Sequence, residues 1–403
     1  MIINSSVAKG QIIAPPSKSM AHRYLICASL AQGTSTIKNI DLSEDIKATL
    51  SCLSQLGAKY QLLKDENGLY TVKVEGCNGN IVNTSTCFDC NESGSTLRFF
   101  LPLAMLKEEP SVFKGSPVLL NRPLSIYTDI CKEQGIALEK LDGQIRVQGK
   151  LRPSNFVIDA NISSQFITGL LLTLVLLDKD SSLELRNTIE SKPYIDMTLQ
   201  VLNDFGIVAK WEKDNVLYIP GCQKYKATEA EVEGDYSNAA FFEALNTIGG
   251  NVEVKGLNPA SLQGDKVYIE LFKKLQNSFE TIDISDCPDL GPILFSVAAA
   301  HKGGVFIGTK RLRIKESNRG AVMCEELAKF GVKTLMEDNK ITIYQSTLKR
   351  PEVDVLGHND HRIVMALATL LTKTGGSIQG ETAVRKSFPD YFAKLRSLGI
   401  DIA

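Results

Sequence analysis

Six segments of the chain share one pattern, in which a short start rich in Ser, Thr, Asp or Asn runs into a stretch of small and apolar residues. Such polar residues commonly cap the N-termini of helices. Apolar residues on nearly every face of the following stretches predict helices that are buried inside a domain. The starts lie at 17–19, 92–96, 163–165, 235–238, 288–291 and 359–362, and the helices are expected over 21–30, 97–106, 166–177, 239–245, 292–300 and 363–371. Because the starts recur mostly at intervals of roughly 70 residues, they indicate duplicated supersecondary units.

Short runs bounded by turn residues lie between the predicted helices, at 10–14, 69–74, 144–147, 216–219 and 340–344. In several of these runs apolar and polar residues alternate, which is typical of strands with one face exposed to solvent. Helices and strands therefore alternate, and the sequence predicts an α/β fold. The same kind of unit begins again near 233–235, where we expect a domain boundary.

The length and composition favour a folded protein of two domains. The chain has 403 residues, more than a single hydrophobic core usually serves. Hydrophobic residues make up 43% and charged residues 23% of the sequence, which is typical of a globular protein and not of a disordered one. The net charge of −1 gives no general attraction to nucleic acid or to an anionic membrane, so any anion-binding site must be local.

The cysteines and the N-terminus favour a cytoplasmic protein with reduced thiols. The nine cysteines are odd in number and scattered, so they do not form a recognisable disulfide framework. Cys87 and Cys90 have the spacing of some metal and redox sites, but without a second such pair or a nearby His we prefer ordinary thiols. The N-terminus lacks the features of a signal peptide, and the apolar stretch 170–177 is too short to span a bilayer.

Cationic side chains at or near the predicted helix starts are the candidates for binding a substrate. Helix N-termini attract anions, because their first N–H groups lack partners and carry the positive end of the helix dipole. Arginine adds a planar fork that fits carboxylate and phosphate, and lysine adds a point charge. The candidates are Lys18, Arg23, Arg98, Arg122, Arg311, Arg313, Lys315, Arg319, Arg362 and Lys386. As an ordered set, they predict a site for small anionic substrates.

Each of these features also has an ordinary structural interpretation. A single Lys or Arg is usually a solvated surface charge, and the segment 311–319 could be an exposed helix face. Gly94 could be a turn residue, His361 a packed histidine and Asp289 a helix cap. No one of them identifies a binding site; only their order along the chain does.

Ten motifs carry a resemblance that covers almost the whole chain. They include Pro-Ser-Lys-Ser-Met-Ala-His-Arg at 16–23, Glu-Ser-Gly-Ser-Thr-Leu-Arg at 92–98 and Asn-Asp-His-Arg at 359–362. The others lie at 121–124, 163–166, 191–194, 233–235, 288–289, 313–319 and 388–391. In content and order these motifs resemble the 5-enolpyruvylshikimate-3-phosphate synthase (EPSP synthase) family. The chain departs from the usual family pattern at Glu92, Arg311 and Asn318, which bears on affinity and inhibitor sensitivity.

The resemblance implies an enolpyruvyl transferase fold. Such a fold has two similar domains, each built from three βαβαββ-type units as an inside-out α/β barrel, with the active site in the cleft between them. On this basis we expect one discontinuous domain of residues 1–14 plus 234–403 and a second domain of residues 15–233.

The resemblance also implies a reaction. The enolpyruvyl group of phosphoenolpyruvate (PEP) would pass to the 5-hydroxyl of shikimate 3-phosphate, in the biosynthesis of chorismate and aromatic amino acids. Addition would form a tetrahedral intermediate, and elimination would release phosphate. We expect no metal or organic cofactor, no nucleic-acid or membrane partner, and a monomer.

The residue roles carried over from the family fall into three groups. Proton transfer would involve Asp289, as the base for the 5-hydroxyl, and Glu316 with Lys18 at the methylene carbon of PEP. Shikimate 3-phosphate would be bound by Lys18, Ser19, Arg23, Ser163, Ser164, Gln165, Ser191, Tyr194, Asp289 and Lys315. PEP would be bound by Lys18, Gly94, Arg122, Gln165, Arg319, Arg362 and Lys386.

Two alternative functions compete with this hypothesis. UDP-N-acetylglucosamine enolpyruvyl transferases share the fold, but they usually carry a reactive Cys where this chain has Pro117. A non-catalytic phosphate-binding module would have no need of proton-transfer groups such as Asp289, Glu316 and Lys18. A shared fold does not fix function, so the site residues decide between these hypotheses.

Overall fold

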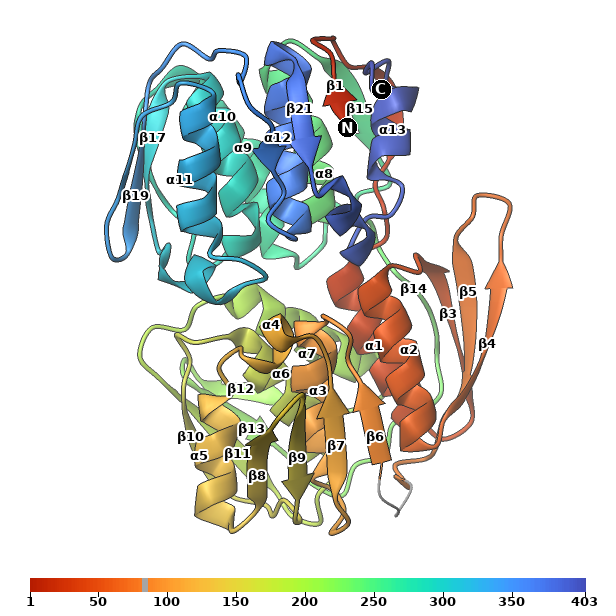
Figure 1. Ribbon diagram of the computed structural model, residues 1–403. Coiled ribbons are helices and arrows are strands. Elements are labelled where there is room, and N and C mark those ends of the chain that lie inside the picture. Colours follow the sequence, from red (N-terminus) through yellow and green to blue (C-terminus); the bar gives the residue numbers. More distant parts are fainter. Residues whose placement is uncertain (82–85) are drawn as a thin grey trace. The chain divides into compact units, whose positions relative to one another are not determined.

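The computed structural model describes residues 1–81 and 86–403 and divides the chain into two compact units (Figure 1). One unit consists of Met1–Ser17 together with Glu233–Ala403, and the other of Lys18–Val232. The sequence placed the boundaries after residue 14 and before residue 234. Each unit has its own hydrophobic core.

All six helices predicted from the polar starts are present. They are α1 (Lys18–Leu30), α3 (Gly94–Ala104), α6 (Ser164–Leu174), α8 (Tyr236–Thr247), α10 (Gly291–Ala300) and α12 (His361–Thr374). Their burial is also confirmed: in α1, every residue from Met20 to Leu30 is buried. Four of these helices are capped by a side chain of the polar start, from Ser93, Ser163, Asp235 and Asp360.

The described residues of the unit Lys18–Val232 form four further helices and twelve strands. The helices are α2 (Glu44–Leu56), α4 (Pro117–Leu120), α5 (Ser125–Gln134) and α7 (Lys192–Asp204). The strands are β3 (Thr34–Ile40), β4 (Lys59–Lys64), β5 (Tyr70–Glu75), β6 (Thr86–Asp89), β7 (Ser111–Lys114), β8 (Ala137–Leu141), β9 (Gln144–Gln148), β10 (Asn155–Asp159), β11 (Ser181–Arg186), β12 (Lys210–Lys213), β13 (Val216–Ile219) and β14 (Glu229–Glu231). Three four-stranded sheets result, with the orders β14-β3-β5-β4, β6-β7-β9-β8 and β10-β11-β13-β12.

These sheets follow the expected βαβαββ plan. The series β10, α6, β11, α7, β12, β13 is complete, with a parallel first pair and antiparallel strands after it. The series around α3 and α5 repeats this plan. In the remaining sheet the first strand is β14, from the end of the unit, which pairs in parallel with β3. The outgoing chain therefore completes the sheet that follows α1.

The unit of Met1–Ser17 and Glu233–Ala403 has the same kinds of element. Its other helices are α9 (Tyr268–Asn277), α11 (Arg319–Lys329) and α13 (Tyr391–Ser397). Its strands are β1 (Ile2–Ile3), β2 (Lys9–Ile13), β15 (Asn251–Lys255), β16 (Glu280–Asp283), β17 (Gly303–Ile307), β18 (Thr334–Met336), β19 (Lys340–Tyr344), β20 (Val355–Leu356) and β21 (Gly376–Gln379). Short 3-10 turns are η1 (Gly264–Val267), η2 (Pro288–Leu290), η3 (Lys310–Ile314) and η4 (Glu381–Lys386).

Only one series in this unit is complete, and it forms the sheet β16-β17-β19-β18 around α10 and α11. The strands β15 and β2 form a pair, and β1 joins β21 and β20 in a third small sheet. In Figure 1, β17 and β19 lie outside α10 and α11, and β3 and β5 lie outside α1 and α2. Buried helices inside and sheets outside agree with the inside-out arrangement, but no sheet of the described residues closes into a barrel.

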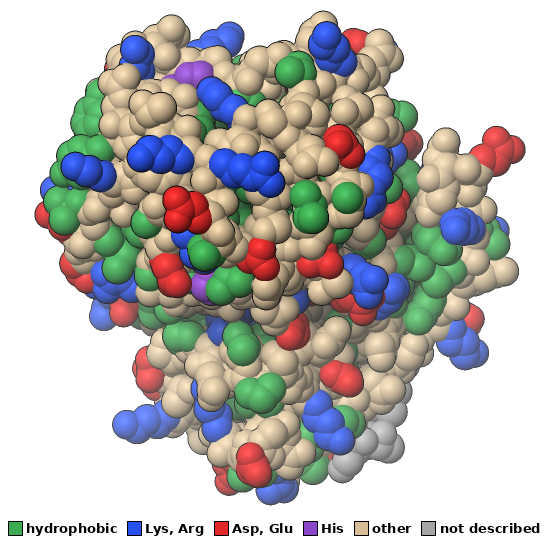
Figure 2. All heavy atoms as spheres, turned by 45° about the horizontal axis from the view of Figure 1, so that its top comes forward, with side chains coloured by type: hydrophobic (Ala, Val, Ile, Leu, Met, Phe, Trp, Pro, Cys, Tyr) green, Lys and Arg blue, Asp and Glu red, His purple; other side chains and the backbone are tan. Residues whose placement is uncertain are grey.

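The surface charges and the thiols do not point to a particular function. On the face seen in Figure 2, Lys and Arg side chains are interspersed with Asp and Glu. All nine cysteines are free thiols, with Cys87 exposed and Cys90 buried. Across the residues that the structure describes, none of the helices has the length and apolar character needed to cross a membrane.

Candidate active site

Asp289, in the 3-10 turn η2 before α10, is the carboxylate on which three cationic side chains converge. Lys315 Nζ and Arg319 Nη1 donate to its Oδ1 at 3.1 and 2.9 Å. Arg362 Nη2 donates to its Oδ2 at 3.1 Å. The cations come from the segment after η3, from the start of α11 and from the start of α12. Residues from three separate sequence motifs therefore meet at one carboxylate.

Arg319 is anchored by several carboxylates. Its Nε and Nη2 donate to Asp360 at 2.8 and 3.3 Å, and Nη2 also donates to Glu316 Oε2 at 2.6 Å. The side chain is only 1% exposed. Burial alone would lower the pKa of Arg319, but Asp360, Glu316 and Asp289 outweigh burial and raise it. Arg319 is thus a permanent, fixed cation.

The charge state of Asp289 follows from these neighbours. Burial would raise the pKa of Asp289, yet the cations of Arg362, Lys315 and Arg319 together outweigh burial and hold it well below its usual range. For Lys315, burial lowers the pKa more than the Asp289 carboxylate raises it. Asp289 is therefore ionised near neutral pH, and its capacity to accept a proton depends on how closely the cations hold it.

Arg362, the second residue of α12, is held by two elements at once. Its Nη1 donates to Ser237 Oγ at 2.6 Å and to the backbone oxygen of Asp289 at 3.3 Å. Its own N–H donates to Asp360 Oδ1 at 3.0 Å, which caps α12. Asp360 thus starts the helix that carries Arg362 and also fixes Arg319.

Lys386, at the end of η4, lies beside the same helix start. Its Nζ donates to the carbonyl oxygen of Asn359 at 2.5 Å. His358 and Asn359 have φ values of 47° and 52°, so the chain turns sharply before α12. This turn places the Asn359 carbonyl where Lys386 reaches it.

In the unit of Lys18–Val232, the first candidate is Lys18 at the start of α1. Its Nζ lies 2.7 Å from Asp45 Oδ2, with side chains 17% and 11% exposed. Asp45 belongs to the first turn of α2, where a carboxylate is favoured by the helix dipole. Two helix starts therefore meet at this ion pair.

Arg23 lies one turn beyond Lys18 in α1 and is 3% exposed. Its Nε donates to Thr198 Oγ1 at 2.9 Å, and its Nη1 donates to the Ser19 carbonyl at 2.6 Å. Its Nη2 donates to Thr168 Oγ1 at 3.2 Å and to the Tyr194 carbonyl at 3.0 Å. Burial lowers its pKa to about 10, so it remains a cation. Because these bonds use four of its five N–H groups, Arg23 mainly joins α1, α6 and α7, and its contact with a ligand stays a prediction.

Gly94 is surrounded by candidate side chains. A Cβ atom at this position would lie 2.7 Å from Arg122 Nη1 and 3.1 Å from Arg98 Nη1. Arg98 Nη1 also donates to Gln165 Oε1 at 2.7 Å, and Gln165 Nε2 donates to Ser95 Oγ at 3.0 Å. Glycine at this position is thus what lets two guanidinium groups approach the start of α3.

A buried chain of hydroxyl groups supports the same start. His22 Nδ1 and Thr49 Oγ1 lie 2.7 Å apart, and Thr49 Oγ1 lies 2.8 Å from Thr96 Oγ1. Thr96 Oγ1 then donates to Ser93 Oγ at 2.7 Å. Burial, followed by two nearby cations, holds the pKa of His22 well below its usual range, so the ring is neutral. The chain ties α1 and α2 to the turn before Gly94.

The serines predicted to bind substrate lie at three helix starts, with Ser19 in the first turn of α1. Ser163 Oγ accepts from the Gln165 N–H at 3.3 Å and caps α6, and Ser164 is buried beside it. Ser191, before α7, has a φ of 58°, and its backbone carbonyl oxygen accepts from the Tyr194 N–H at 3.0 Å. The starts of α1, α3, α6 and α7 therefore lie within one unit, together with the predicted substrate-binding residues that they carry.

Several residues that organise these groups are not among the site residues predicted from the sequence. Asp45 pairs with Lys18, Asp360 pairs with Arg319, and Ser237 accepts from Arg362. Asp360 and Ser237 belong to the polar starts 359–362 and 235–238. Their residue types, which are typical of helix caps, were the signal in the sequence that could have located them. Asp45 follows Ser43 and Glu44, and this capping pattern is the signal for the start of α2 that could have located it.

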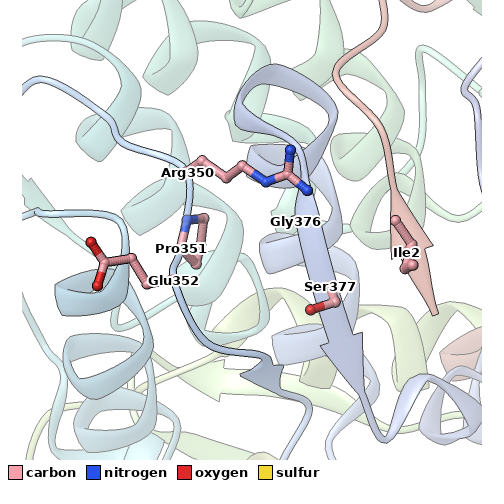
Figure 3. A pocket seen from close by; sticks show the side chains of 6 residues that line it. All are labelled: Ile2, Arg350, Pro351, Glu352, Gly376 and Ser377. Atoms are coloured by element: carbon pink, nitrogen blue, oxygen red, sulfur yellow. The ribbon is translucent and has the colours of Figure 1, made fainter.

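A depression of about 500 Å³ lies elsewhere in the unit of Met1–Ser17 and Glu233–Ala403. Figure 3 shows its lining, with Arg350, Pro351 and Glu352 on one segment and Ile2, Gly376 and Ser377 on β1 and β21. It contains none of the predicted site residues. The convergence of charged groups on Asp289 is therefore a better guide to the chemistry than the size of this depression.

Glu325, Glu326 and His358 form a group whose ligand atoms lie within 4.8 Å of one another, as a metal site would require. The Glu326 carboxylate, however, already has protein partners. Lys329 Nζ lies 2.9 Å from its Oε2, and the Leu356 N–H donates to the same oxygen at 2.9 Å. These contacts explain the burial of Glu326 without a metal ion.

Solved structures with the same architecture define the class of fold. The chain is similar to an EPSP synthase from Acinetobacter baumannii, with a TM-score of 0.77 at 22% identity, covering 100% of this chain and 99% of the other. It is also similar to the enolpyruvyl transferase NikO from Streptomyces tendae, with a TM-score of 0.76 at 13% identity, covering 100% and 97%. The fold is that of the enolpyruvyl transferases.

The sequence comparisons narrow this class to a family. A model of the family described as EPSP synthase (3-phosphoshikimate 1-carboxyvinyltransferase) matches residues 3–395. A 3-phosphoshikimate 1-carboxyvinyltransferase of Clostridium acetobutylicum is 40% identical, covering 99% of this chain and 97% of the relative. One from Clostridium beijerinckii is also 40% identical, covering 97% and 95%. The chain belongs to the EPSP synthase family.

Proposed function

We propose that the chain transfers the enolpyruvyl group of PEP to the 5-hydroxyl of shikimate 3-phosphate, with release of phosphate. The family and the names of its relatives support this reaction over UDP-N-acetylglucosamine as acceptor. One structural observation carries the proposal: the Asp289 carboxylate is held among Lys315, Arg319 and Arg362. This arrangement supports Asp289 as a base for the hydroxyl group, beside cations suited to the carboxylate and phosphate of PEP.

The reaction proceeds by addition and elimination. The 5-hydroxyl oxygen bonds to the central carbon of PEP and loses its proton, while the methylene carbon gains one. The tetrahedral intermediate then loses phosphate as a proton leaves the new methyl group and the double bond forms again. The fixed cations stabilise the negative charge of the intermediate.

Asp289 is proposed as the group that accepts the hydroxyl proton. In the structure its three cations favour the carboxylate and weaken it as a base. Substrate anions that pair with Arg319 and Arg362 would draw positive charge away from Asp289. Its pKa would then rise toward the range in which it accepts a proton.

Glu316 and Lys18 are proposed for proton transfer at the methylene carbon. Arg319 donates to Glu316 at 2.6 Å, which favours the charged carboxylate. This suits Glu316 better for accepting a proton in the elimination step than for donating one in the addition step. Lys18, an ammonium held by Asp45, is then the donor that we propose for the addition step.

The binding roles remain as the family resemblance implies. We propose that shikimate 3-phosphate is bound by Lys18, Ser19, Arg23, Ser163, Ser164, Gln165, Ser191, Tyr194, Asp289 and Lys315. We propose that PEP is bound by Lys18, Gly94, Arg122, Gln165, Arg319, Arg362 and Lys386. The monomeric state stays a prediction from the family resemblance. The cytoplasmic location stays a prediction from the sequence.

Steady-state phosphate release tests the proposed function. Purified protein should release phosphate from PEP with shikimate 3-phosphate and not with UDP-N-acetylglucosamine. Turnover with the nucleotide sugar alone would favour the alternative transferase. Ligand binding without any turnover would favour a non-catalytic module. Detection of the enolpyruvyl product by mass spectrometry separates transfer from simple hydrolysis of PEP.

A further inference from the structure

Asp265 is a buried carboxylate that none of the roles above uses. It lies in the turn η1 (Gly264–Val267), before α9, and is 3% exposed. Carboxylates are rarely buried to this degree without a specific partner. Its surroundings lead directly to the residues around Asp289.

The position of Asp265 is fixed by Gln263, two residues before it. Gln263 Nε2 donates to Glu233 Oε1 at 2.7 Å and to the Gly234 carbonyl at 2.8 Å. Gln263 Oε1 accepts from the Tyr236 N–H at 3.1 Å. The turn that carries Asp265 is therefore tied to the start of α8.

Ser237, in the first turn of α8, connects Asp265 with Arg362. Arg362 Nη1 donates to Ser237 Oγ at 2.6 Å. A guanidinium group can only donate, and a hydroxyl group has one proton of its own to give. That proton is directed to Asp265, with which Ser237 forms a side-chain hydrogen bond. Arg362 in turn donates to Asp289 Oδ2 at 3.1 Å.

We infer that Asp265 is a positioning residue for the transfer reaction, which holds the Arg362 guanidinium beside Asp289 through the hydroxyl of Ser237. This inference rests on the proposed function, in which Arg362 binds PEP. An ionised Asp265 orients the Ser237 proton toward itself and leaves the serine lone pairs for Arg362. A neutral group at Asp265 accepts more weakly, so Arg362 is held less firmly.

The surroundings of Asp265 make its charge sensitive to pH. Burial, followed by the charge of Asp289, raises its pKa to about 6, while Arg362 and the Ser237 hydrogen bond act in the opposite direction. Asp235 adds a smaller upward shift, and the buried thiol of Cys287 also faces this group. Below about pH 6, Asp265 takes up a proton and its hold on Ser237 weakens.

The experiment compares the wild-type chain with Asp265→Asn from about pH 5 to about pH 9, with separate values of kcat and KM for PEP. Because the phosphates of both substrates also titrate near pH 6, the quantity to follow is the ratio of variant to wild-type KM. We expect this ratio to be roughly tenfold at high pH and to approach one below about pH 6, where wild-type Asp265 is itself neutral. The KM for shikimate 3-phosphate should change much less.

Two further variants keep the inference testable. Ser237→Ala should raise the KM for PEP as Asp265→Asn does, and the double variant should be no worse than either single one. Ser237→Thr, which retains the hydroxyl, should restore binding. Asp214→Asn is the matched control, because Asp214 is exposed in the turn between β12 and β13. If Asp265→Asn does not fold, the serine variants carry the same test.

The outcomes separate this inference from the proposed function. A wild-type chain that releases no phosphate with shikimate 3-phosphate overturns the proposed function itself. A fully active wild type, with an unchanged KM for PEP in Asp265→Asn and Ser237→Ala, overturns only the positioning role. A variant-to-wild-type ratio that is the same at every pH also contradicts it, because a purely structural role would act equally on both sides of pH 6.

Discussion

Arg319 and Asp360 form a buried ion pair, with Nε 2.8 Å from Oδ2 and side chains 1% and 0% exposed. Removal of the Asp360 charge would leave the buried Arg319 guanidinium with only Glu316 and Asp289, two partly exposed carboxylates, as charged partners. Asp360→Asn should therefore lower the free energy of unfolding by about 3 kcal/mol. Denaturant unfolding of the purified variant measures this change.

The exposed pair of Arg313 and Asp338 provides the matched control. Its atoms lie 2.9 Å apart, close to the 2.8 Å of the buried pair, but its side chains are 39% and 73% exposed. Asp338→Asn should change the free energy of unfolding by less than about 1 kcal/mol. Equal losses for the two substitutions would contradict the importance of burial at Asp360.

Gly94→Ala should weaken PEP binding with little effect on shikimate 3-phosphate. The new Cβ atom would lie 2.7 Å from Arg122 Nη1, so the guanidinium group must move away. Loss of a well-placed cation contact should raise the KM for PEP roughly tenfold. Initial rates with each substrate varied in turn measure both effects. An equal rise in both KM values would indicate a general distortion of α3 instead.

Lys18→Met should damage turnover far more than folding. The dipole of α2 still favours the Asp45 carboxylate when Lys18 is removed, so the loss of stability should be modest. Loss of a cation at a reacting centre, in contrast, costs about a hundredfold in kcat. The control is Lys47→Met, since Lys47 forms an exposed pair with Glu44. Thermal unfolding and phosphate release distinguish the two roles. A large loss of thermal stability with near-normal activity would overturn the assignment of Lys18.

The sequence predicted the helices better than it predicted the contacts between them. Polar starts followed by apolar runs identified α1, α3, α6, α8, α10 and α12, because capping and burial act over a few neighbouring residues. The family resemblance supplied Asp289, Lys315, Arg319 and Arg362, which the structure brings together.

What the sequence did not reveal depends on distant segments. Asp265 meets Ser237 only because Gln263 ties its turn to the start of α8. Asp360 is a cap in the sequence, but its second partner, Arg319, is 41 residues away. No local pattern of residues encodes either contact, since each depends on how the helices pack.

The raised pKa of Asp265 also predicts how stability depends on pH. Its pKa rises from an ordinary value of 3.8 to about 6 on folding, so between these values the folded chain binds more protons than the unfolded chain. Stability from this group is therefore complete below about pH 4 and is lost as the pH rises through about 6. Relative to Asp265→Asn, which has no titrating group here, the wild type should lose up to about 3 kcal/mol across this range. Urea unfolding at several pH values gives the slope of the free energy of unfolding against pH for each protein. A cost of the substitution that is the same at every pH does not affect this slope. Parallel stability curves for the two proteins would show that Asp265 titrates as an ordinary carboxylate.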